Sequence, residues 1–258
     1  MFIFSFDLKK KVRHIRNIVC IYRPVVRKWC KTCLLTFFCW SIFFVWLYTF
    51  VRPPFTPLMI IRSIDKLVHL QAPIWDQTWV PIEKISPYVV YAVIAAEDNK
   101  FVTHFGFDVQ ALQNAIEYDL SHKWSTIWGS TISQQTAKNV FLRPGRDFLR
   151  KWLEAYFTLL MESMWSKERI MEVYLNDIEF GDGIYGIEAA SQYYFHTPAK
   201  KLTSYQASLL AAILPNPRYY QTHLNTYLIQ RRKNAISNNI GRVRGNKQTR
   251  TFVKSLKN

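Results

Sequence analysis

The stretch that decides the fold is SPYVVYAVIAAEDNKFVTHFGFD, residues 86–108. Ser86 and Pro87 are start signals of a helix, and the residues after them are almost all apolar until Glu97 and Asp98. A carboxylate at the end of an apolar helix is partly desolvated and lies at the negative end of the helix dipole. Both effects raise its pKa. Glu97 is therefore a candidate general base. The alternative is that Glu97 and Asp98 end the helix in solvent and that His104 is an ordinary polar contact.

Helical patterns continue on the C-terminal side of this stretch. Asp108 can cap a helix in which Val109, Leu112, Ile116 and Leu120 recur at helical spacing. Further helices are predicted at 131–141, 147–164, 167–176, 186–195 and 203–214. The sequence contains no persuasive period-two strand pattern and no internal repeat, which predicts one mostly α domain.

On the N-terminal side, residues 32–51 are twenty uncharged residues. At about 1.5 Å per residue they can cross roughly 30 Å of hydrocarbon, which predicts one transmembrane helix. Residues 1–31 carry nine Lys and Arg and orient the N-terminus to the cytoplasm, with the rest of the chain outside. A cleaved signal peptide is the competing interpretation, but the apolar stretch is long and RPPFTPL follows it where a small-x-small cleavage site should be.

The charge lies at the two ends of the chain. There are 34 Lys and Arg against 18 Asp and Glu, a formal net charge of +16, yet residues 32–217 carry a net charge of −2. Residues 218–258 hold ten basic and no acidic residues and are predicted to be a basic tail. This distribution favours a membrane over nucleic acid as the partner. The tail either touches anionic phospholipid or is simply solvated.

Residues 52–82 mix proline with apolar residues and are predicted to be an extended, membrane-proximal connector.

A second polar cluster lies in WGSTISQQTAKNVFL, residues 128–142. The sequence predicts that a helix opens here, and helix N-termini attract anions, to which a lysine adds a point charge. A phosphate-bearing substrate fits such a site, although the spacing is not that of a P-loop. The alternative is a capped surface helix with solvated amides. The polar residues concerned are Ser130, Thr131, Gln134, Gln135, Lys138 and Asn139.

Two further patterns have simple structural interpretations. Arg150 and Glu154 are four residues apart on one predicted helix, where an exposed salt bridge is the default. Residues 181–186 match the glycine spacing of a dinucleotide fingerprint, but they lack the preceding strand and the acidic residue about 20 positions later. Their glycines are instead predicted to form a tight loop that enters the helix at 187–195.

Taken together and in order, five segments resemble the motifs of the peptidoglycan glycosyltransferases, glycosyltransferase family 51. They are EDNKFVTHFGFD, GSTISQQTAKNVFL, RKWLE, KERIMEVYLNDIEFG and GIEAASQYYF. The resemblance covers roughly residues 84–217 and implies a mostly α, lysozyme-like glycosyltransferase domain at 83–217 behind the transmembrane helix. Trp128 departs from the small residue that relatives often have before Gly129.

The resemblance implies an enzyme that polymerises lipid II outside the cytoplasmic membrane. The growing strand on its lipid diphosphate is the donor, and the GlcNAc 4-hydroxyl of lipid II is the acceptor of an inverting transfer. Glu97 matches the general base, and Glu154 matches the second glutamate near the donor diphosphate. Lys138 and Arg150 match residues that stabilise the departing diphosphate. The substrate-binding residues implied by the motifs are Asp98, Phe101, His104, Ser130, Thr131, Gln134, Gln135 and Asn139.

The resemblance also implies a divalent cation, Mg²⁺ or Mn²⁺, that assists diphosphate departure, and no organic cofactor. The partners expected are lipid II, the growing glycan strand, membrane lipids and other cell-wall synthesis proteins, with no nucleic acid. The location expected is the bacterial inner membrane, single-pass, with the catalytic domain in the periplasm. Two alternatives stay open. A muramidase also uses two carboxylates but needs neither an anion site nor an anchor, and a catalytically silent scaffold has no need of both glutamates.

Overall fold

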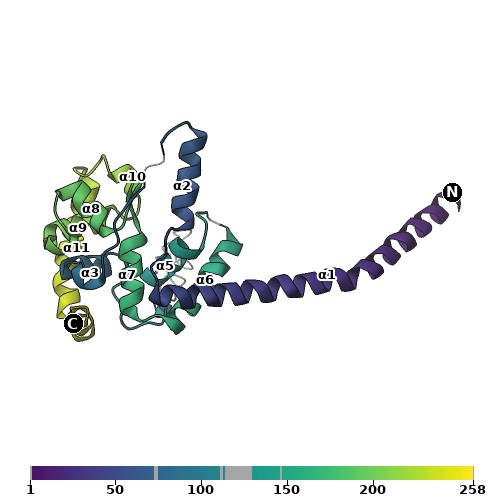
Figure 1. Cartoon of the computed structure of the whole chain (residues 1–258), viewed down its shortest axis with the longest axis horizontal. Helices are drawn as coiled ribbons and strands as arrows, with labels where there is room; N and C mark the ends of the chain where they lie inside the picture. The colour runs from purple at the N-terminus through teal and green to yellow at the C-terminus, as the bar shows by residue number, and fades with distance from the viewer. Residues whose placement is uncertain (1, 73–74, 111–112, 114–129, 146, 258) are drawn as a thin grey trace. The chain divides into compact units, whose positions relative to one another are not determined.

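The computed structural model describes residues 2–72, 75–110, 113, 130–145 and 147–257, and its side chains from residue 22 onward (Figure 1). The chain divides into two compact units, Met1–Leu47 and Tyr48–Asn258. Trp128, Gly129 and most of the helix predicted after Asp108 lie outside the described residues.

The first unit is part of one long helix, α1 (Phe2–Phe50). Within the described residues, Tyr22–Phe50 is the one helical segment long and apolar enough to cross a membrane. It contains nearly all of the predicted anchor at 32–51. Large apolar side chains such as Leu35 and Trp40 are exposed on it, as a helix that contacts lipid requires. The structure is therefore compatible with a membrane anchor here.

The second unit is mostly helical, as predicted. Its helices are α2 (Pro57–Val68), α3 (Pro87–Glu97), α5 (Ile132–Phe141), α6 (Phe148–Met164), α7 (Lys167–Asp177), α8 (Ile187–Phe195), α9 (Ser204–Ile213), α10 (Pro217–Tyr220), α11 (Tyr227–Gly245) and α12 (Lys247–Ser255). The helices predicted from residue 131 to residue 214 each begin and end within one residue of their observed bounds. Their capping signals explain this accuracy, because Thr131, Asp147, Ser166 and Thr203 all accept a hydrogen bond from the first turn that follows them.

Helix α3 lies at the centre of one half of this unit. It packs against α9 and α11, which also pack against each other, while α5 packs against α6 and α7 in the other half (Figure 1). Residues 89–95 of α3 are all buried, as expected for a helix that is apolar on every side. This burial fixes the end of α3, and with it Glu97, next to α5.

Three short strands form a small sheet that the sequence analysis missed. They are β1 (Asp76–Gln77), β2 (Glu179–Gly181) and β3 (Ile184–Tyr185), with β3 in the middle, parallel to β1 and antiparallel to β2. Strands of two or three residues are too short to show an alternating pattern. Gly186 follows β3 with φ of +80°, and a Cβ there would lie 2.5 Å from the carbonyl oxygen of Asn176. The prediction of a tight glycine loop entering α8 is confirmed.

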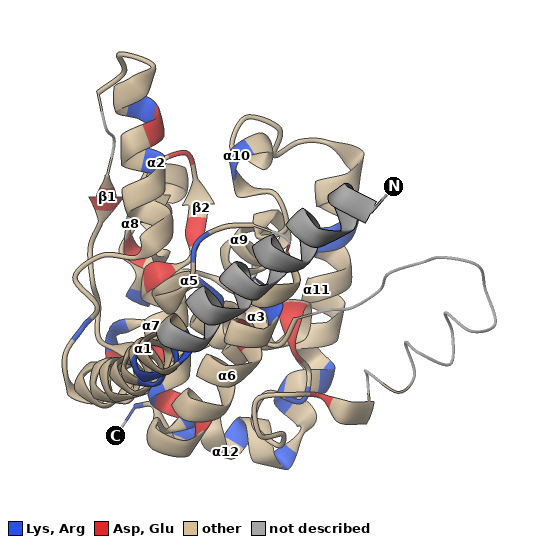
Figure 2. Ribbon diagram, turned by 90° about the vertical axis from the view of Figure 1, so that its right-hand side faces the viewer, with Lys and Arg blue, Asp and Glu red and all other residues tan. Residues whose placement is uncertain are grey.

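Two segments differ from the expected organisation. The described part of the tail predicted at 218–258 contains most of α10 and all of α11 and α12, and it belongs to the second unit rather than to a separate tail. The buried residues of α11 include Ile229, Ile236, Ile240 and Val243, which recur at helical spacing between the basic residues (Figure 2). The 52–82 segment is not extended throughout, because Thr56 caps α2 within it.

Candidate active site

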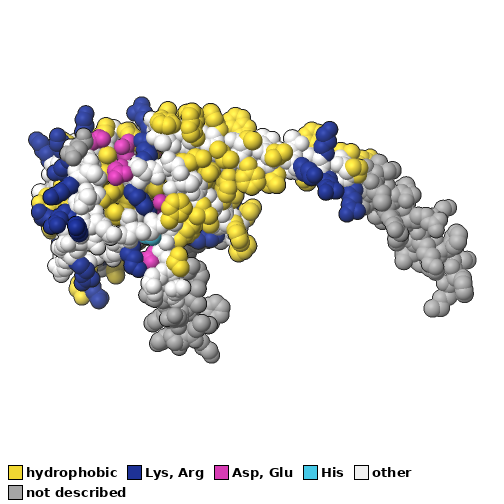
Figure 3. Space-filling model, turned by 90° about the horizontal axis from the view of Figure 1, so that it is seen from below, with side chains coloured by type: hydrophobic (Ala, Val, Ile, Leu, Met, Phe, Trp, Pro, Cys, Tyr) yellow, Lys and Arg dark blue, Asp and Glu magenta, His cyan; other side chains and the backbone are white. Residues whose placement is uncertain are grey.

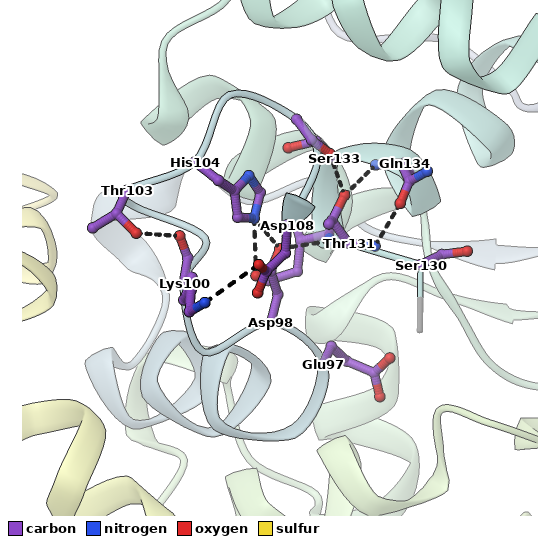
Figure 4. Close-up of polar contacts among 12 residues, drawn as sticks. Glu97, Asp98, Lys100, Thr103, His104, Asp108, Ser130, Thr131, Ser133 and Gln134 are labelled. Atoms are coloured by element: carbon purple, nitrogen blue, oxygen red, sulfur yellow. Dashed lines mark hydrogen bonds and ion pairs between the residues drawn. The ribbon is translucent and has the colours of Figure 1, made fainter. Parts of the chain in front are cut away.

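Glu97 is the last residue of α3, and its side chain is 15% exposed. The Gln135 side chain on α5 donates a hydrogen bond to Oε2 of Glu97 at 2.8 Å. The Arg232 guanidinium on α11 donates to Oε1 at 3.0 Å. Figure 4 shows that the Glu97 carboxylate points away from the neighbouring Asp98 and from the loop that follows. Glu97 is thus held at the meeting point of three helices with both carboxylate oxygens engaged.

The pKa of Glu97 is raised above its ordinary value because the carboxylate is buried. The hydrogen bond from Gln135 and the charges of Arg232 and Lys138 act in the opposite direction and lower this pKa, but burial is the largest effect. This is the direction of pKa shift that the apolar helix before Glu97 predicts. A half-buried carboxylate with a raised pKa can accept a proton from a hydroxyl group.

Asp98 stabilises the loop after α3 through hydrogen bonds, and we do not place it among the reacting groups. His104 Nε2 lies 2.9 and 2.8 Å from its two carboxylate oxygens, and the backbone N–H of Ile132 donates to Oδ2 at 3.1 Å (Figure 4). These bonds tie the loop after α3 to the start of α5. Phe101 in the same loop is completely buried and packs edge-on against Phe252. We therefore place Asp98, Phe101 and His104 among the residues that support the site, because their side chains are taken up inside the fold.

The start of α5 is a capping box, which uses two residues that were expected to line the substrate site. Thr131 accepts from the backbone N–H of Gln134, and the Gln134 side chain accepts from the backbone N–H of Thr131. The Thr131 hydroxyl also donates to the carbonyl oxygen of Gly106 at 2.6 Å. Thr131 and Gln134 are buried, so they position α5, whereas Ser130, Gln135 and Asn139 stay partly exposed.

Lys138 lies one helical turn after Gln135 on α5 and is partly exposed. Burial lowers the pKa of Lys138, and the carboxylates of Glu154 and Glu97 oppose this change. The ammonium group is therefore within electrostatic reach of both glutamates. Helix α5 thus supplies two groups from adjacent turns. The Gln135 amide donates a hydrogen bond to Glu97, and the Lys138 ammonium interacts electrostatically with both glutamates.

Arg150 and Glu154 form a buried ion pair on α6, contrary to the exposed salt bridge taken as the default. Arg150 Nη1 donates to Glu154 Oε2 at 2.6 Å, and Lys151 pairs with the other carboxylate oxygen. The Glu154 side chain is 2% exposed and that of Arg150 is 12% exposed. Glu154 is therefore a fixed, fully paired anion, and Arg150 is held in place by it.

Arg232 lies at the site and was not predicted from the sequence. It lies in the run Arg231-Arg232-Lys233, where nothing in the pattern distinguishes one cation from the next. Tyr174 on α7 was also missed, and its hydroxyl lies 3.4 Å from the Gln135 carbonyl oxygen. Only the packing of α7 and α11 identifies these two residues.

The described residues do not form a site for the divalent cation that was expected. No three His, Cys, Asp or Glu side chains among them are grouped so as to hold a metal ion. The carboxylates of Glu97 and Glu154 are each paired with cationic side chains. These donors do not fit a resident metal, and we derive no step from one.

Comparison with known proteins shows the family to which this chain belongs. A family model described as Transglycosylase matches residues 68–241, which include Glu97, Glu154 and Arg232. Two relatives are named biosynthetic peptidoglycan transglycosylase. The protein of Bdellovibrio bacteriovorus is 52% identical over 215 residues, 83% of this chain and 86% of the relative. The protein of Bacteroides thetaiotaomicron is 47% identical over 218 residues, 83% of this chain and 88% of the relative.

A third relative of the same name, from Escherichia coli, is 48% identical over 176 residues, 68% of this chain and 73% of the relative. This chain belongs to the transglycosylase family and is a glycosyltransferase of peptidoglycan synthesis in the bacterial cell wall.

Proposed function

We propose that the enzyme transfers the growing glycan strand from its lipid diphosphate to the GlcNAc 4-hydroxyl of lipid II, with inversion at the anomeric carbon. Glu97 is the general base. The acceptor hydroxyl oxygen forms a bond to the anomeric carbon, the bond from that carbon to the diphosphate breaks, and the hydroxyl proton passes to Glu97. The observation that carries this proposal is the Glu97 carboxylate itself, half-buried, raised in pKa and oriented by Gln135.

Lys138 and Arg150 stabilise the departing diphosphate in this proposal. Negative charge develops on the leaving group as the bond breaks, and fixed cations there lower the barrier. Lys138 interacts electrostatically with both Glu154 and Glu97. Glu154 acts by holding Arg150 through the 2.6 Å ion pair. Holding the guanidinium in place before the substrate arrives reduces the reorganisation needed during the reaction.

The membrane brings the substrate to the site. We propose that Tyr22–Phe50 spans the inner membrane with the N-terminus in the cytoplasm and the second unit in the periplasm, because the basic residues precede the apolar stretch. Helix α2 exposes Ile60, Ile64 and Leu67 at helical spacing. Figure 3 shows hydrophobic side chains gathered over one part of the molecule and Lys and Arg gathered over another. The exposed apolar face of α2 then contacts the bilayer in which lipid II lies.

The test is polymerisation of labelled lipid II by the full chain in detergent. Glycan ladders from the wild type and none from Glu97→Gln are expected, because glutamine keeps the shape of the side chain and cannot accept the proton. Ser163→Ala is the matched control, since Ser163 is exposed and bonds only within its own helix turn. Ladders from Glu97→Gln at the wild-type rate would overturn the assignment of the base. Cleavage of preformed glycan in place of polymerisation would support a muramidase instead.

A further inference from the structure

Helix α11 holds the end of α3 at two points on one of its faces. Arg232 Nη2 contacts Glu97 Oε1 at 3.0 Å. Asn239, two turns later, donates its side-chain N–H to the carbonyl oxygen of Ala95 at 2.9 Å and to Asn99 Oδ1 at 3.0 Å. Residues seven apart lie on the same side of a helix. The face of α11 that carries Arg232 is therefore packed against the turn of α3 that carries Glu97.

We infer that Arg232 is a positioning residue for the glycosyl transfer, which keeps the Glu97 carboxylate ionised and aimed at the acceptor hydroxyl. The inference rests on the proposed role of Glu97 as the base. Nothing in the sequence assigns a function to Arg232, and its side chain is 37% exposed, so it is not held there by burial alone. The ion pair is the contact that distinguishes it from the cations on either side.

The charged and polar groups around Glu97 show why Arg232 is needed to keep its carboxylate ionised. Arg232 faces it from α11, Lys138 from α5 and the Tyr174 hydroxyl from α7. Burial also raises the pKa of Tyr174, so its hydroxyl stays neutral and adds no negative charge beside Glu97. Lys138 is shared with Glu154 and, in the proposed mechanism, is taken up by the donor diphosphate. Arg232 is then the cation that stays with Glu97 while the substrates are bound.

A base in this position faces two opposing requirements. Burial raises the pKa of Glu97 and makes the carboxylate a better proton acceptor, but it also increases the protonated fraction, which cannot act. An opposite charge at hydrogen-bond distance favours the ionised form. The same ion pair favours loss of the proton after each transfer, which returns Glu97 to its active form for the next addition.

The experiment measures the rate of lipid II polymerisation against pH for the full chain carrying Arg232→Gln, Arg232→Lys or Arg231→Gln. With Arg232→Gln the acid limb of the profile is expected to move to higher pH. Activity then falls several-fold at acidic pH and recovers as the pH rises. Arg232→Lys keeps a positive charge, so its acid limb should lie at a pH between that of the wild type and that of Arg232→Gln. Arg231→Gln removes the same charge from the neighbouring, exposed residue and should leave the limb unchanged.

Several outcomes separate this inference from a structural role and from the proposed function. A uniform loss of activity at every pH with Arg232→Gln, or an unmoved acid limb, overturns the inference. Asn239→Ala removes the second contact of α11 with α3 and leaves Arg232 in place, so an equal shift of its acid limb would also overturn it. If Glu97→Gln does not polymerise lipid II and the acid limb of Arg232→Gln is unmoved, only this inference is rejected. If Glu97→Gln is active, the assignment of Glu97 as the base is rejected. If Arg232→Gln fails to fold, the acid limb of Arg232→Lys tests the inference: a shift to higher pH supports it, and an unmoved limb overturns it.

Discussion

The side-chain amide of Gln135 on α5 donates a hydrogen bond of 2.8 Å to the carboxylate of Glu97 at the end of α3. The Gln135 carbonyl oxygen faces the Tyr174 hydroxyl at 3.4 Å, which fixes the orientation of the amide. Two helices from different parts of the sequence are thus joined at the candidate base. A hydrogen bond to a carboxylate stabilises its charged form.

Gln135→Leu is expected to lower the rate of polymerisation roughly tenfold at neutral pH, the effect of losing about 1.4 kcal/mol of a hydrogen bond to a charged group. Because this bond lowers the pKa of Glu97, part of the loss should be recovered at higher pH. The measurement is the initial rate on labelled lipid II at several pH values. An unchanged rate would show that Gln135 does not orient the base.

Glu154→Gln is expected to reduce both stability and activity. It leaves the largely buried Arg150 and the more exposed Lys151 without their shared anion, and breaking a buried pair such as Arg150–Glu154 typically costs about 3 kcal/mol or more. Urea unfolding of the detergent-solubilised chain measures the first effect and lipid II turnover measures the second. The control Glu188→Gln removes a carboxylate whose contacts lie in a different part of the unit. Full activity of Glu154→Gln would exclude the proposed support of Arg150.

Asp177→Asn is expected to flatten the dependence of stability on pH. Burial raises the pKa of Asp177 from 3.8 to about 8 in the folded protein, against a hydrogen bond from Gln77. The folded state therefore binds an extra proton between these two values, and the free energy of unfolding falls as the pH rises through that range. Asparagine keeps an oxygen for Gln77 and carries no charge, so the variant should be more stable than the wild type above about pH 8.

Unfolding curves at acidic, neutral and alkaline pH check this prediction. Asp65→Asn is the matched control, because the Asp65 side chain is 58% exposed. A pH dependence in Asp177→Asn as steep as that of the wild type would contradict it.

Replacing Ile60, Ile64 and Leu67 by serine is expected to lower turnover of lipid II in bilayers and to have a smaller effect in detergent. These α2 side chains are 38%, 54% and 57% exposed, so their loss removes little of the core. Phe55 is also exposed and Leu58 is half-buried, so the connector offers further apolar contacts. Sedimentation with lipid vesicles measures the membrane contact itself. Equal turnover of wild type and triple variant in bilayers would exclude this face as a membrane contact.

Gly186→Ala is expected to destabilise the second unit by about 3 kcal/mol or more. Gly186 has φ of +80°, and an added Cβ would lie 2.5 Å from the Asn176 backbone oxygen, which cannot move independently. Gly241→Ala on α11 is the control, because a Cβ there meets nothing within 4 Å. Thermal unfolding compares the two variants, and equal midpoints would contradict the prediction.

The sequence alone predicted the parts of the molecule that depend on local interactions. The long apolar helix follows from a run of uncharged residues as long as a bilayer is thick, and the helices from 131 to 214 follow from capping residues and apolar spacing. The apolar stretch before Glu97 was enough to predict the direction of the pKa shift of this carboxylate, although three helices meet around it.

Only the tertiary structure decided which side chains meet at the end of that helix. Arg232 is 135 residues from Glu97 in the chain, and its neighbours Arg231 and Lys233 have similar side chains, so only the rotation of α11 against α3 selects it. Tertiary packing also buries the Arg150–Glu154 pair on α6, makes α11 in the basic C-terminal segment part of the folded unit and takes Phe101 into the core. These features depend on contacts between distant segments, which periodicity and local spacing do not encode.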